Sequence, residues 1–595
     1  MKKYKTRAEV EDKYKWDLTD LFKDEKDFDK SFKQARKDVG ELKKYVGCTK
    51  DSSKLLEFLE KDINTLALVE RLYIYAYLIN DQELGNSKSI DKKNKASDLY
   101  NMYSLNVSFF NPELLKLNKD EYSKLFENEK LLEFKYALDD IYRNKEHILD
   151  ENSENIISEL NNAMNHFEDM SSTMLNSEHN YGNVIIDGEE EKITTTNYRR
   201  LMKNKDRKLR KDVREKFNTV IDRYGVSSSQ FLNGYVKANI TTSKIHNYKD
   251  AWDAKLFGLK LTDKAYKSLI EVVEANVDKL QKYYKVYKKK FNFDKLYQYD
   301  LGLDLTNNEK EYSIEEAQDL CLKVVEPLGR DYVKHFKKII DNRYIDYAQY
   351  PSKCSGGYSF APLDRDSKIL MSYNYDLESV STIIHEGGHN VHHQYVAENN
   401  PLEYRSVSSL IAEVASLTNE CLLSSYLADN ALSNDDKIAG ISNIVDVIIS
   451  NLYGAVREGK IELDFYNYVN DGNTITKDYM KELELDSLKK YYGNIVELDN
   501  LSGLSWIRRS HYYMNYYLFN YAFCISVATN VAKEIIDGNS DMLDKYLKFL
   551  KTGSNIDIID VFKIIDIDLE NKKVYENAIK YFDSMIEKLE ELIWK

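Results

Sequence analysis

Two histidines and a glutamate form the pattern with the clearest chemistry in the chain, His385-Glu386-Gly387-Gly388-His389. Residues four apart lie on the same face of a helix, so both imidazoles can reach one metal ion. Catalytic zinc sites use three protein ligands and keep a fourth position for water, whose pKa falls to about 7. Glu386 follows the first ligand, and we expect it to reach that water rather than the metal. The pattern therefore predicts a zinc site with Glu386 as general base, able to pass a proton to a leaving amine.

The third metal ligand must come from another segment. The next predicted helix contains Ser409–Glu420, with two acids, Glu413 and Glu420. Glu413 is flanked by apolar residues on both sides, where an acid is expensive to bury unless it is paired or bound to metal. We predict Glu413 as the third ligand. Glu420 lies seven residues further on the same face and could hydrogen-bond a ligand histidine.

The residues around the histidine pair give further expectations. Gly387 and Gly388 are poor helix formers, so their place within a helix predicts that backbone or substrate packs very close to them. His392 and His393 follow directly. We expect His392 to support the metal ligands without binding the metal itself. We expect His393 to lie at a solvent-exposed helix end.

A hydrolase also needs hydrogen-bond donors for the oxyanion that forms during the reaction. His511 is followed by five tyrosines within ten residues. Imidazole N–H and phenol O–H groups are neutral donors at pH 7, so this segment is our candidate. An aromatic-rich core helix is the alternative interpretation of the same pattern.

The rest of the chain must position these groups. Only five prolines and 22 glycines occur in 595 residues, which predicts a mostly α-helical protein. Extended structure is expected in two places: a hairpin at 183–193 with an Asp-Gly turn, and a small sheet or pair of extended segments within 344–375. Apolar periodicity predicts helices over the ranges 54–78, 151–174, 196–224, 377–397 and 407–428. We place a domain boundary at the hairpin, with an N-terminal helical lobe at 1–182 and a catalytic domain at 183–595.

Composition excludes several classes of protein. With 85 basic and 99 acidic residues the net charge is −14, which argues against a nucleic-acid binder. The five scattered cysteines suggest free thiols in a reducing compartment, hence the cytoplasm, and the N-terminus has no secretory signal. The most apolar segments, such as 517–532, are interrupted by asparagine, so none is expected to span a membrane.

Taken together, the chain resembles oligoendopeptidase F, in the thimet oligopeptidase and neurolysin superfamily of zinc peptidases. The resemblance covers nearly the whole length, and the order and spacing of its blocks are more specific than the zinc motif alone. The blocks that carry it are Lys15–Phe22, Asp206–Phe217, Tyr297–Leu301, Glu326–Tyr332, Gly356–Ser359, His385–His392, Ala412–Ser416, Asn419-Glu420 and His511–Tyr521.

The resemblance implies a mostly helical, two-lobed body that encloses a deep channel, with a small sheet beside the zinc-binding helix. Such a channel would admit short unfolded oligopeptides and exclude folded proteins. By position, one zinc ion would be held by His385, His389 and Glu413, and internal peptide bonds would be cut with Glu386 as general base.

The resemblance also implies roles for residues away from the metal. His511, Tyr517 and Tyr513 would bind the substrate carbonyl and the oxyanion. Gly356, Tyr358 and Tyr516 would contact substrate, the first two along a strand that pairs with its backbone. The family often has Phe at position 512 and Tyr at 519, where this chain has Tyr512 and Phe519.

Two other functions fit the same residues. A zinc carboxypeptidase of similar helical architecture would trim one residue from a C-terminus, and a non-catalytic protein of this fold would only bind peptides. A purely structural helical protein would bind no metal. The sequence leaves open the cleavage preference, the length limit, the physiological substrates, the oligomeric state and whether another divalent metal replaces zinc.

Overall fold

A computed structural model gives the structure of the chain and describes residues 4–150, 166–306 and 310–594, with 153, 154, 156, 157 and 160 in addition. Helices make up most of the described residues, and the described strands are only two to four residues long. The predicted fold class, mostly α with a small sheet, is confirmed.

The chain folds into two compact units, each assembled from three separate stretches. Unit 1 comprises Met1–Glu146, Glu309–Leu423 and Val531–Ile567. Unit 2 comprises His147–Asn308, Ser424–Asn530 and Asp568–Lys595. This division does not follow the boundary that we placed at 182/183, and the extent of a catalytic domain stays a prediction.

Unit 1 contains an N-terminal group of helices whose starts are set by short polar side chains. Asp24, Asp51, Asn86 and Asn118 each accept backbone N–H bonds at a helix start, which satisfies donors that the first turn leaves free. Their apolar faces enclose one core that also includes Leu370. The helices are α1 (Glu25–Leu42), α2 (Ser52–Gln82), α3 (Ser87–Val107), α4 (Phe110–Lys116), α5 (Lys119–Leu125) and α6 (Lys135–Tyr142).

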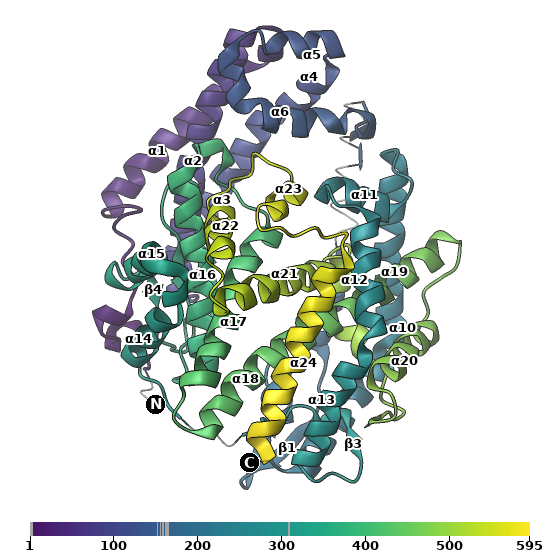
Figure 1. The fold of residues 1–595 in the computed structure, drawn as a ribbon. Helices are drawn as coiled ribbons and strands as arrows, with labels where there is room; N and C mark the ends of the chain where they lie inside the picture. The colour runs from purple at the N-terminus through teal and green to yellow at the C-terminus, as the bar shows by residue number, and fades with distance from the viewer. Residues whose placement is uncertain are drawn as a thin grey trace. The chain divides into compact units, whose positions relative to one another are not determined.

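The remaining helices of unit 1 surround the histidine motif. Figure 1 shows α14 and α15 beside α16, and the contacts within the unit agree. α17 begins in unit 1 and ends in unit 2. These helices are α14 (Ile314–Val324), α15 (Gly329–Asp341), α16 (Leu377–Asn399), α17 (Ser409–Asn430), α22 (Ser540–Leu550) and α23 (Ile558–Lys563).

A three-stranded sheet lies beside α16. Its order is β4 (Ile345–Asp346), β6 (Lys368–Leu370), β5 (Tyr358–Phe360), with β4 parallel and β5 antiparallel to β6. The register pairs Ile345 with Ile369 and Tyr358 with Leu370. The extended backbone predicted for 344–375 is therefore confirmed.

Unit 2 contains the predicted hairpin. Its strands β1 (Asn183–Ile186) and β2 (Glu189–Lys192) pair antiparallel, and Asp187 and Gly188 both have positive φ, as a two-residue turn requires. The other elements of this unit are α8 (His166–Thr173), α9 (Tyr198–Met202), α10 (Arg207–Ile245), α11 (Ala251–Leu259), α12 (Asp263–Ala275), α13 (Val277–Lys290), β3 (Leu296–Tyr297), α18 (Asn434–Ile448), α19 (Ala455–Asn470), α20 (Lys477–Tyr492), β7 (Val496–Glu497), α21 (Leu518–Ile536, which ends in unit 1) and α24 (Lys572–Trp594).

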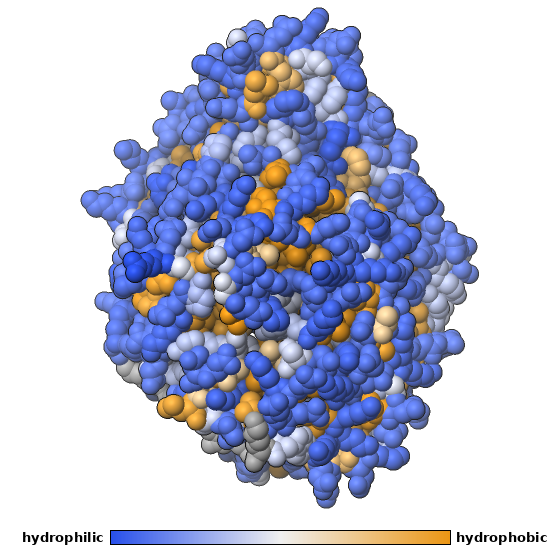
Figure 2. Space-filling view, in the orientation of Figure 1, coloured by the Kyte–Doolittle hydropathy of each residue, from blue (hydrophilic) through white to orange (hydrophobic). Residues whose placement is uncertain are grey.

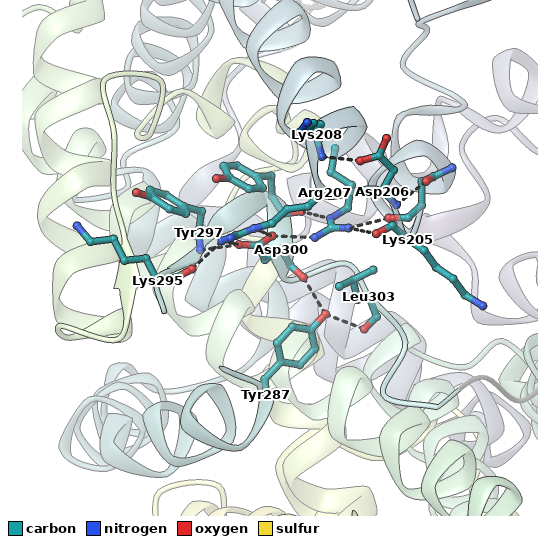
Figure 3. A network of polar contacts seen from close by, with 12 residues as sticks. Lys205, Asp206, Arg207, Lys208, Tyr287, Lys295, Tyr297, Asp300 and Leu303 are labelled. Carbon is teal, nitrogen blue, oxygen red and sulfur yellow. Dashed lines mark hydrogen bonds and ion pairs between the residues drawn. The ribbon is translucent and has the colours of Figure 1, made fainter. Parts of the chain in front are cut away.

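A buried ion-pair network fastens two distant parts of unit 2 together. Asp300 is fully buried, and its carboxylate accepts from Arg207 at an N–O distance of 2.8 Å (Figure 3). It also accepts from Arg210 at 2.8 Å. Tyr287 donates to the Asp300 carbonyl at 2.8 Å and to that of Leu303 at 2.7 Å. Because a buried charge is stable only when paired, this network fixes the segment after β3 on the start of α10. It accounts physically for two blocks of the family resemblance, 206–217 and 297–301.

Most of the predicted helices are present. The ranges 54–78, 377–397 and 407–428 correspond to α2, α16 and α17. The helix predicted over 196–224 is interrupted at Lys203 and continues from Arg207 as α10. The helix predicted over 151–174 lies largely outside the described residues, and α8 covers its described end.

The expectation about membrane spans was too strict. Among the described residues, one helical run, Asn434–Asn470, is long and apolar enough to cross a membrane by length and composition. Half of its most apolar stretch is buried inside the protein. Core helices of globular proteins pass the same test. The face of the molecule in Figure 2 is covered mainly by hydrophilic residues, with hydrophobic ones interspersed.

Candidate active site

The histidine motif sits in the middle of α16, which Asp376 caps by accepting the backbone N–H of Ser379. The helix runs well past the motif on both sides, so its geometry there is regular. His385 and His389 project from one face, with ring centroids 4.9 Å apart. The predicted arrangement of the two imidazoles is confirmed.

The two glycines of the motif allow neighbouring helices to come very close. A Cβ atom on Gly388 would lie 2.8 Å from the Cα atom of Ser416 in α17. A Cβ atom on Gly387 would lie 2.4 Å from the ring of Phe336 in α15. The predicted close approach of backbone is confirmed at Gly388, where it brings α17 against the helix that carries the histidines. At Gly387 the close neighbour is an aromatic side chain instead.

Asn419 fixes the register between α16 and α17. Its side-chain nitrogen donates to the carbonyl of Ile384, immediately before the first histidine, at 3.1 Å. Its side-chain oxygen accepts from the hydroxyl of Tyr332 in α15 at 3.1 Å. All three residues are buried, so the bonds are shielded from water. Both residues stand in blocks of the family resemblance, but their contacts could not be predicted because the partners lie far away along the chain.

This packing places Glu413 between the two imidazoles. Glu413 Oε2 lies 3.6 Å from His385 Nε2 and 3.8 Å from His389 Nε2. One donor atom from each of the three residues lies within 4.8 Å of the others. Zinc bonds to nitrogen and oxygen are about 2.0–2.2 Å long, so tetrahedral ligands stand roughly 3.3–3.5 Å apart. Two imidazoles and one carboxylate at these distances fit a zinc ion with small side-chain adjustments.

Glu420 contacts His385 at the ring nitrogen Nδ1. Its Oε1 atom lies 2.5 Å from His385 Nδ1, and its Oε2 atom accepts from Ser381 at 3.4 Å. Burial lowers the pKa of His385, but the hydrogen bond and charge of Glu420 and the charges of Glu386 and Glu413 outweigh burial and raise it to about 9. With Nδ1–H directed at Glu420, Nε2 is the atom left to face a metal.

The Glu386 carboxyl lies against the strand β5. The backbone of Ser359 hydrogen-bonds to it, and its Oε1 atom is 3.7 Å from where a Cβ of Gly357 would be. Burial, reinforced by the charges of Glu413 and Glu420 and opposed by that of His385, raises the pKa of Glu386 to about 7. A carboxyl that titrates near neutrality is suited to accept and return a proton.

β5 forms an edge of its sheet, and two of the predicted substrate contacts, Gly356 and Tyr358, lie just before the strand and within it. Gly356, just before the strand, has a φ of +96°, a conformation that favours glycine. The Tyr358 hydroxyl donates to Asp81 of α2 at 2.7 Å, which anchors the strand to the N-terminal helices. An unpaired edge is free to accept another extended backbone.

His392 and His393 lie within α16 and not at its end. His392 is 1% exposed, its Nε2 atom has no partner among the described residues, and burial lowers its pKa to about 3. His393 is half-buried, and its Nε2 atom lies 3.0 Å from the carbonyl of Arg365. The solvated helix end expected for His393 was wrong, because α16 continues to Asn399.

The second predicted group, around His511, belongs to unit 2. His511 lies in a 3₁₀ turn, Ser510–Tyr513, and its Nε2 atom is 3.2 Å from the hydroxyl of Tyr521. The ring of Tyr517 lies 6.3 Å from that of His511 and 5.4 Å from that of Tyr521. Burial and the charge of Arg509 lower the pKa of His511, so a neutral imidazole is present at pH 7.

The sequence did not single out Tyr521, although it is the described hydrogen-bond partner of His511. Its place in the tyrosine run was the available signal. A cavity of about 460 Å³ within unit 2 opens beside this group. It is lined by Tyr284, Arg457, Glu458, Arg509, His511 and Tyr521, among others.

Tyr513 and Tyr516 point into the core of unit 2. Tyr513 is 9% exposed and packs edge-on against Tyr235, with centroids 5.2 Å apart. Tyr516 is 2% exposed and packs against Trp252 and Tyr466. Tyr517 is the half-buried one of the three, and the roles proposed for Tyr513 and Tyr516 stay predictions.

Comparison with known proteins agrees with the fold and the metal group. Residues 200–581, more than half of the chain, match peptidase family M3, and residues 113–181 match a family described as oligopeptidase F. Oligopeptidase PepF of Bacillus subtilis (strain 168) is 28% identical, over 99% of this chain and 88% of the relative. Group B oligopeptidase PepB of Streptococcus agalactiae serotype III (strain NEM316) is 27% identical, over 99% of this chain and 98% of the relative.

Solved structures share the fold over the full length. A crystal structure from Chlamydophila abortus superposes with a TM-score of 0.90 at 25% identity, over 99% of this chain and 100% of the other. Oligoendopeptidase-F from Enterococcus faecium superposes with a TM-score of 0.74 at 24% identity, over 96% and 99%. The matches and the metal-ligand group together define a metalloendopeptidase. The chain belongs to peptidase family M3, in agreement with the resemblance to oligoendopeptidase F.

Proposed function

We propose that this chain is a zinc-dependent endopeptidase that hydrolyses internal bonds of short, unfolded oligopeptides in the cytoplasm. The observation that carries the proposal is the group of His385, His389 and Glu413, with Glu386 beside it on the same helix turn. The names of the relatives, oligopeptidase and oligoendopeptidase, support peptides as the substrate class. We propose one zinc ion per chain and no role for nucleic acid or a membrane.

In this proposal the residues of unit 1 hold the metal and move the proton. A zinc ion bound by His385, His389 and Glu413 supplies Lewis acidity, which activates water and polarises a peptide carbonyl. Glu386 takes a proton from the attacking water at its carboxylate and returns it to the leaving nitrogen. Glu420 keeps His385 in the tautomer that has Nε2 free for the metal, and His392 supports the helix from its buried face.

The residues of unit 2 would bind the substrate carbonyl. A neutral His511 and the hydroxyls of Tyr517 and Tyr513 are proposed as donors to the oxyanion, which gains negative charge as the tetrahedral intermediate forms. Gly356, Tyr358 and Tyr516 are proposed as substrate contacts. Of the tyrosines, Tyr517 has the strongest support, because it is half-buried beside His511.

One experiment separates this proposal from its alternatives. An internally quenched peptide of about ten residues with a blocked C-terminus is incubated with the purified chain, and the products are identified by mass. Internal cuts that a chelator abolishes and added zinc restores support the proposal. A second peptide with a free C-terminus is tested in parallel. If only this peptide is shortened, one residue at a time, the result would support a carboxypeptidase. Zinc binding without cleavage of either peptide would support a peptide-binding protein.

A further inference from the structure

The loop that joins His511 to Tyr517 has an unusual backbone. Asn515 and Tyr516 have φ angles of +47° and +58°, so two consecutive residues other than glycine are left-handed. Left-handed backbone is disfavoured for such residues relative to right-handed backbone. A conformation of this kind persists only where surrounding contacts hold it.

A buried acid in α19 provides one of these contacts. The backbone N–H of Tyr516 donates to Glu462 Oε1 at 2.7 Å. Glu462 is 0% exposed, and its Oε2 atom has no partner among the described residues. Burial of a half-satisfied carboxyl costs free energy. Neither the metal chemistry nor the proposed oxyanion donors use Glu462, whose carboxyl interacts with the Tyr516 amide and with the charge of Lys255.

Tyrosine hydroxyls hold the preceding residues of the loop. Tyr466, one turn after Glu462 in α19, donates to the side-chain oxygen of Asn515 at 2.8 Å. The hydroxyl of Tyr235 in α10 lies 2.6 Å from the carbonyl of Tyr513 and 3.2 Å from the Asn515 side-chain oxygen. The loop is thus bound at three residues, Tyr513, Asn515 and Tyr516, by two helices of the same unit.

The direction of Tyr517 depends on this loop. Tyr517 follows the second left-handed residue directly, so the backbone at Tyr516 sets the direction in which the Tyr517 side chain leaves the loop. The Tyr516 ring is also fixed, between Trp252 and Tyr466 with centroids at 4.9 and 4.7 Å.

We propose that Glu462, Tyr466 and Tyr235 form a clamp that holds the loop Tyr513–Tyr516 in its left-handed conformation and thereby positions Tyr517 against His511. They are positioning residues, and the inference rests on the proposed roles of His511 and Tyr517 in oxyanion binding. A misplacement of such a donor by about 1 Å is enough to slow an enzymatic step by about 100-fold.

The decisive comparison is between two variants of one residue. Burial raises the pKa of Glu462 to about 8, so glutamine closely resembles its neutral form and keeps the acceptor oxygen. We expect Glu462→Gln to retain kcat within about threefold. We expect Glu462→Ala to lower kcat by tenfold or more with KM and zinc content nearly unchanged. Val469→Ala, in the same helix and buried, is the control for destabilisation alone and is expected to keep kcat.

Tyr235→Phe is the second test, because it removes one hydroxyl and leaves the packing intact. It should lower kcat by about threefold to tenfold without changing zinc content. Hydrogen exchange over residues 511–521 gives a readout independent of activity: exchange should accelerate in Glu462→Ala and Tyr235→Phe, and not in Glu462→Gln. Wild-type kcat and exchange in both Glu462→Ala and Tyr235→Phe would overturn the clamp, as would a Gln variant as slow as the Ala variant.

The same series includes the wild type and His511→Phe, so that the two proposals fail in different ways. An inactive wild type, or a His511→Phe variant as active as the wild type, would overturn the proposed roles in oxyanion binding. A large loss in His511→Phe together with no loss in the clamp variants would overturn the clamp alone.

Discussion

The metal group of unit 1 (His385, His389 and Glu413) lies on two long regular helices. The His511 group of unit 2 lies on a 3₁₀ turn and a loop with left-handed residues. In the first region, helical geometry and the close packing of α17 on α16 set the spacing of the functional side chains. In the second, hydrogen bonds of the loop with Glu462, Tyr466 and Tyr235 set it. The comparison predicts that variants of the metal ligands and of Glu420 change metal binding, while variants of the second region change kcat and leave the metal in place.

The largest effect is expected from loss of a metal ligand. His389→Ala should abolish zinc binding and lower kcat/KM by at least about 1,000-fold, because two remaining ligands do not hold a catalytic zinc. Metal analysis and cleavage of the quenched peptide measure both. His393→Ala, in the same helix but bonded to a backbone carbonyl, is the matched control and should keep both. Full activity of His389→Ala would contradict the assignment of the catalytic metal site to unit 1.

A smaller effect, without metal loss, is expected from the second region. His511→Phe should lower kcat by about 100–1,000-fold at unchanged zinc content, since one oxyanion donor is removed. Tyr512→Phe is the control, because the neighbouring ring is buried and the family often has Phe there. If His511→Phe instead lost its zinc, the contrast between the two units would be wrong.

Glu420→Gln sharpens the same contrast within unit 1. The charge behind His385 is removed while an acceptor oxygen remains, so zinc affinity should fall by about 10–100-fold. A competition titration with a chelator measures the affinity. Activity of the variant should return when zinc is added in excess. A kcat deficit that persists at saturating zinc would mean that Glu420 acts on the reaction itself.

The smallest effect on activity is expected from the ion-pair network of unit 2. Asp300→Asn leaves Arg210 buried without its charge partner, so the free energy of unfolding should fall by about 3–5 kcal/mol. Urea denaturation followed by circular dichroism measures this loss, and kcat below the transition should be unchanged. Asp304→Asn, which breaks the exposed pair with Lys203, is the control and should alter stability little. An equal loss in both variants would contradict the importance of burial.

Local patterns in the sequence predicted the parts of the molecule that local geometry determines. The spacing of His385 and His389 and the Asp187-Gly188 turn follow from rules that act within one helix or one hairpin. Sequence periodicity says nothing about partners far away in the chain. The pairing of Arg210 with Asp300, 90 residues apart, could therefore not be predicted, nor could that of Glu462 with Tyr516, 54 residues apart.

The contribution of Glu386 is the central claim, and one substitution tests it directly. Glu386→Gln keeps the size of the side chain and removes its ability to accept a proton, while His385, His389 and Glu413 are untouched. Zinc content and cleavage of the quenched peptide are measured on the same preparation. The account predicts wild-type zinc and a kcat/KM lowered by about 100–10,000-fold. A zinc-loaded Glu386→Gln variant as active as the wild type would contradict it.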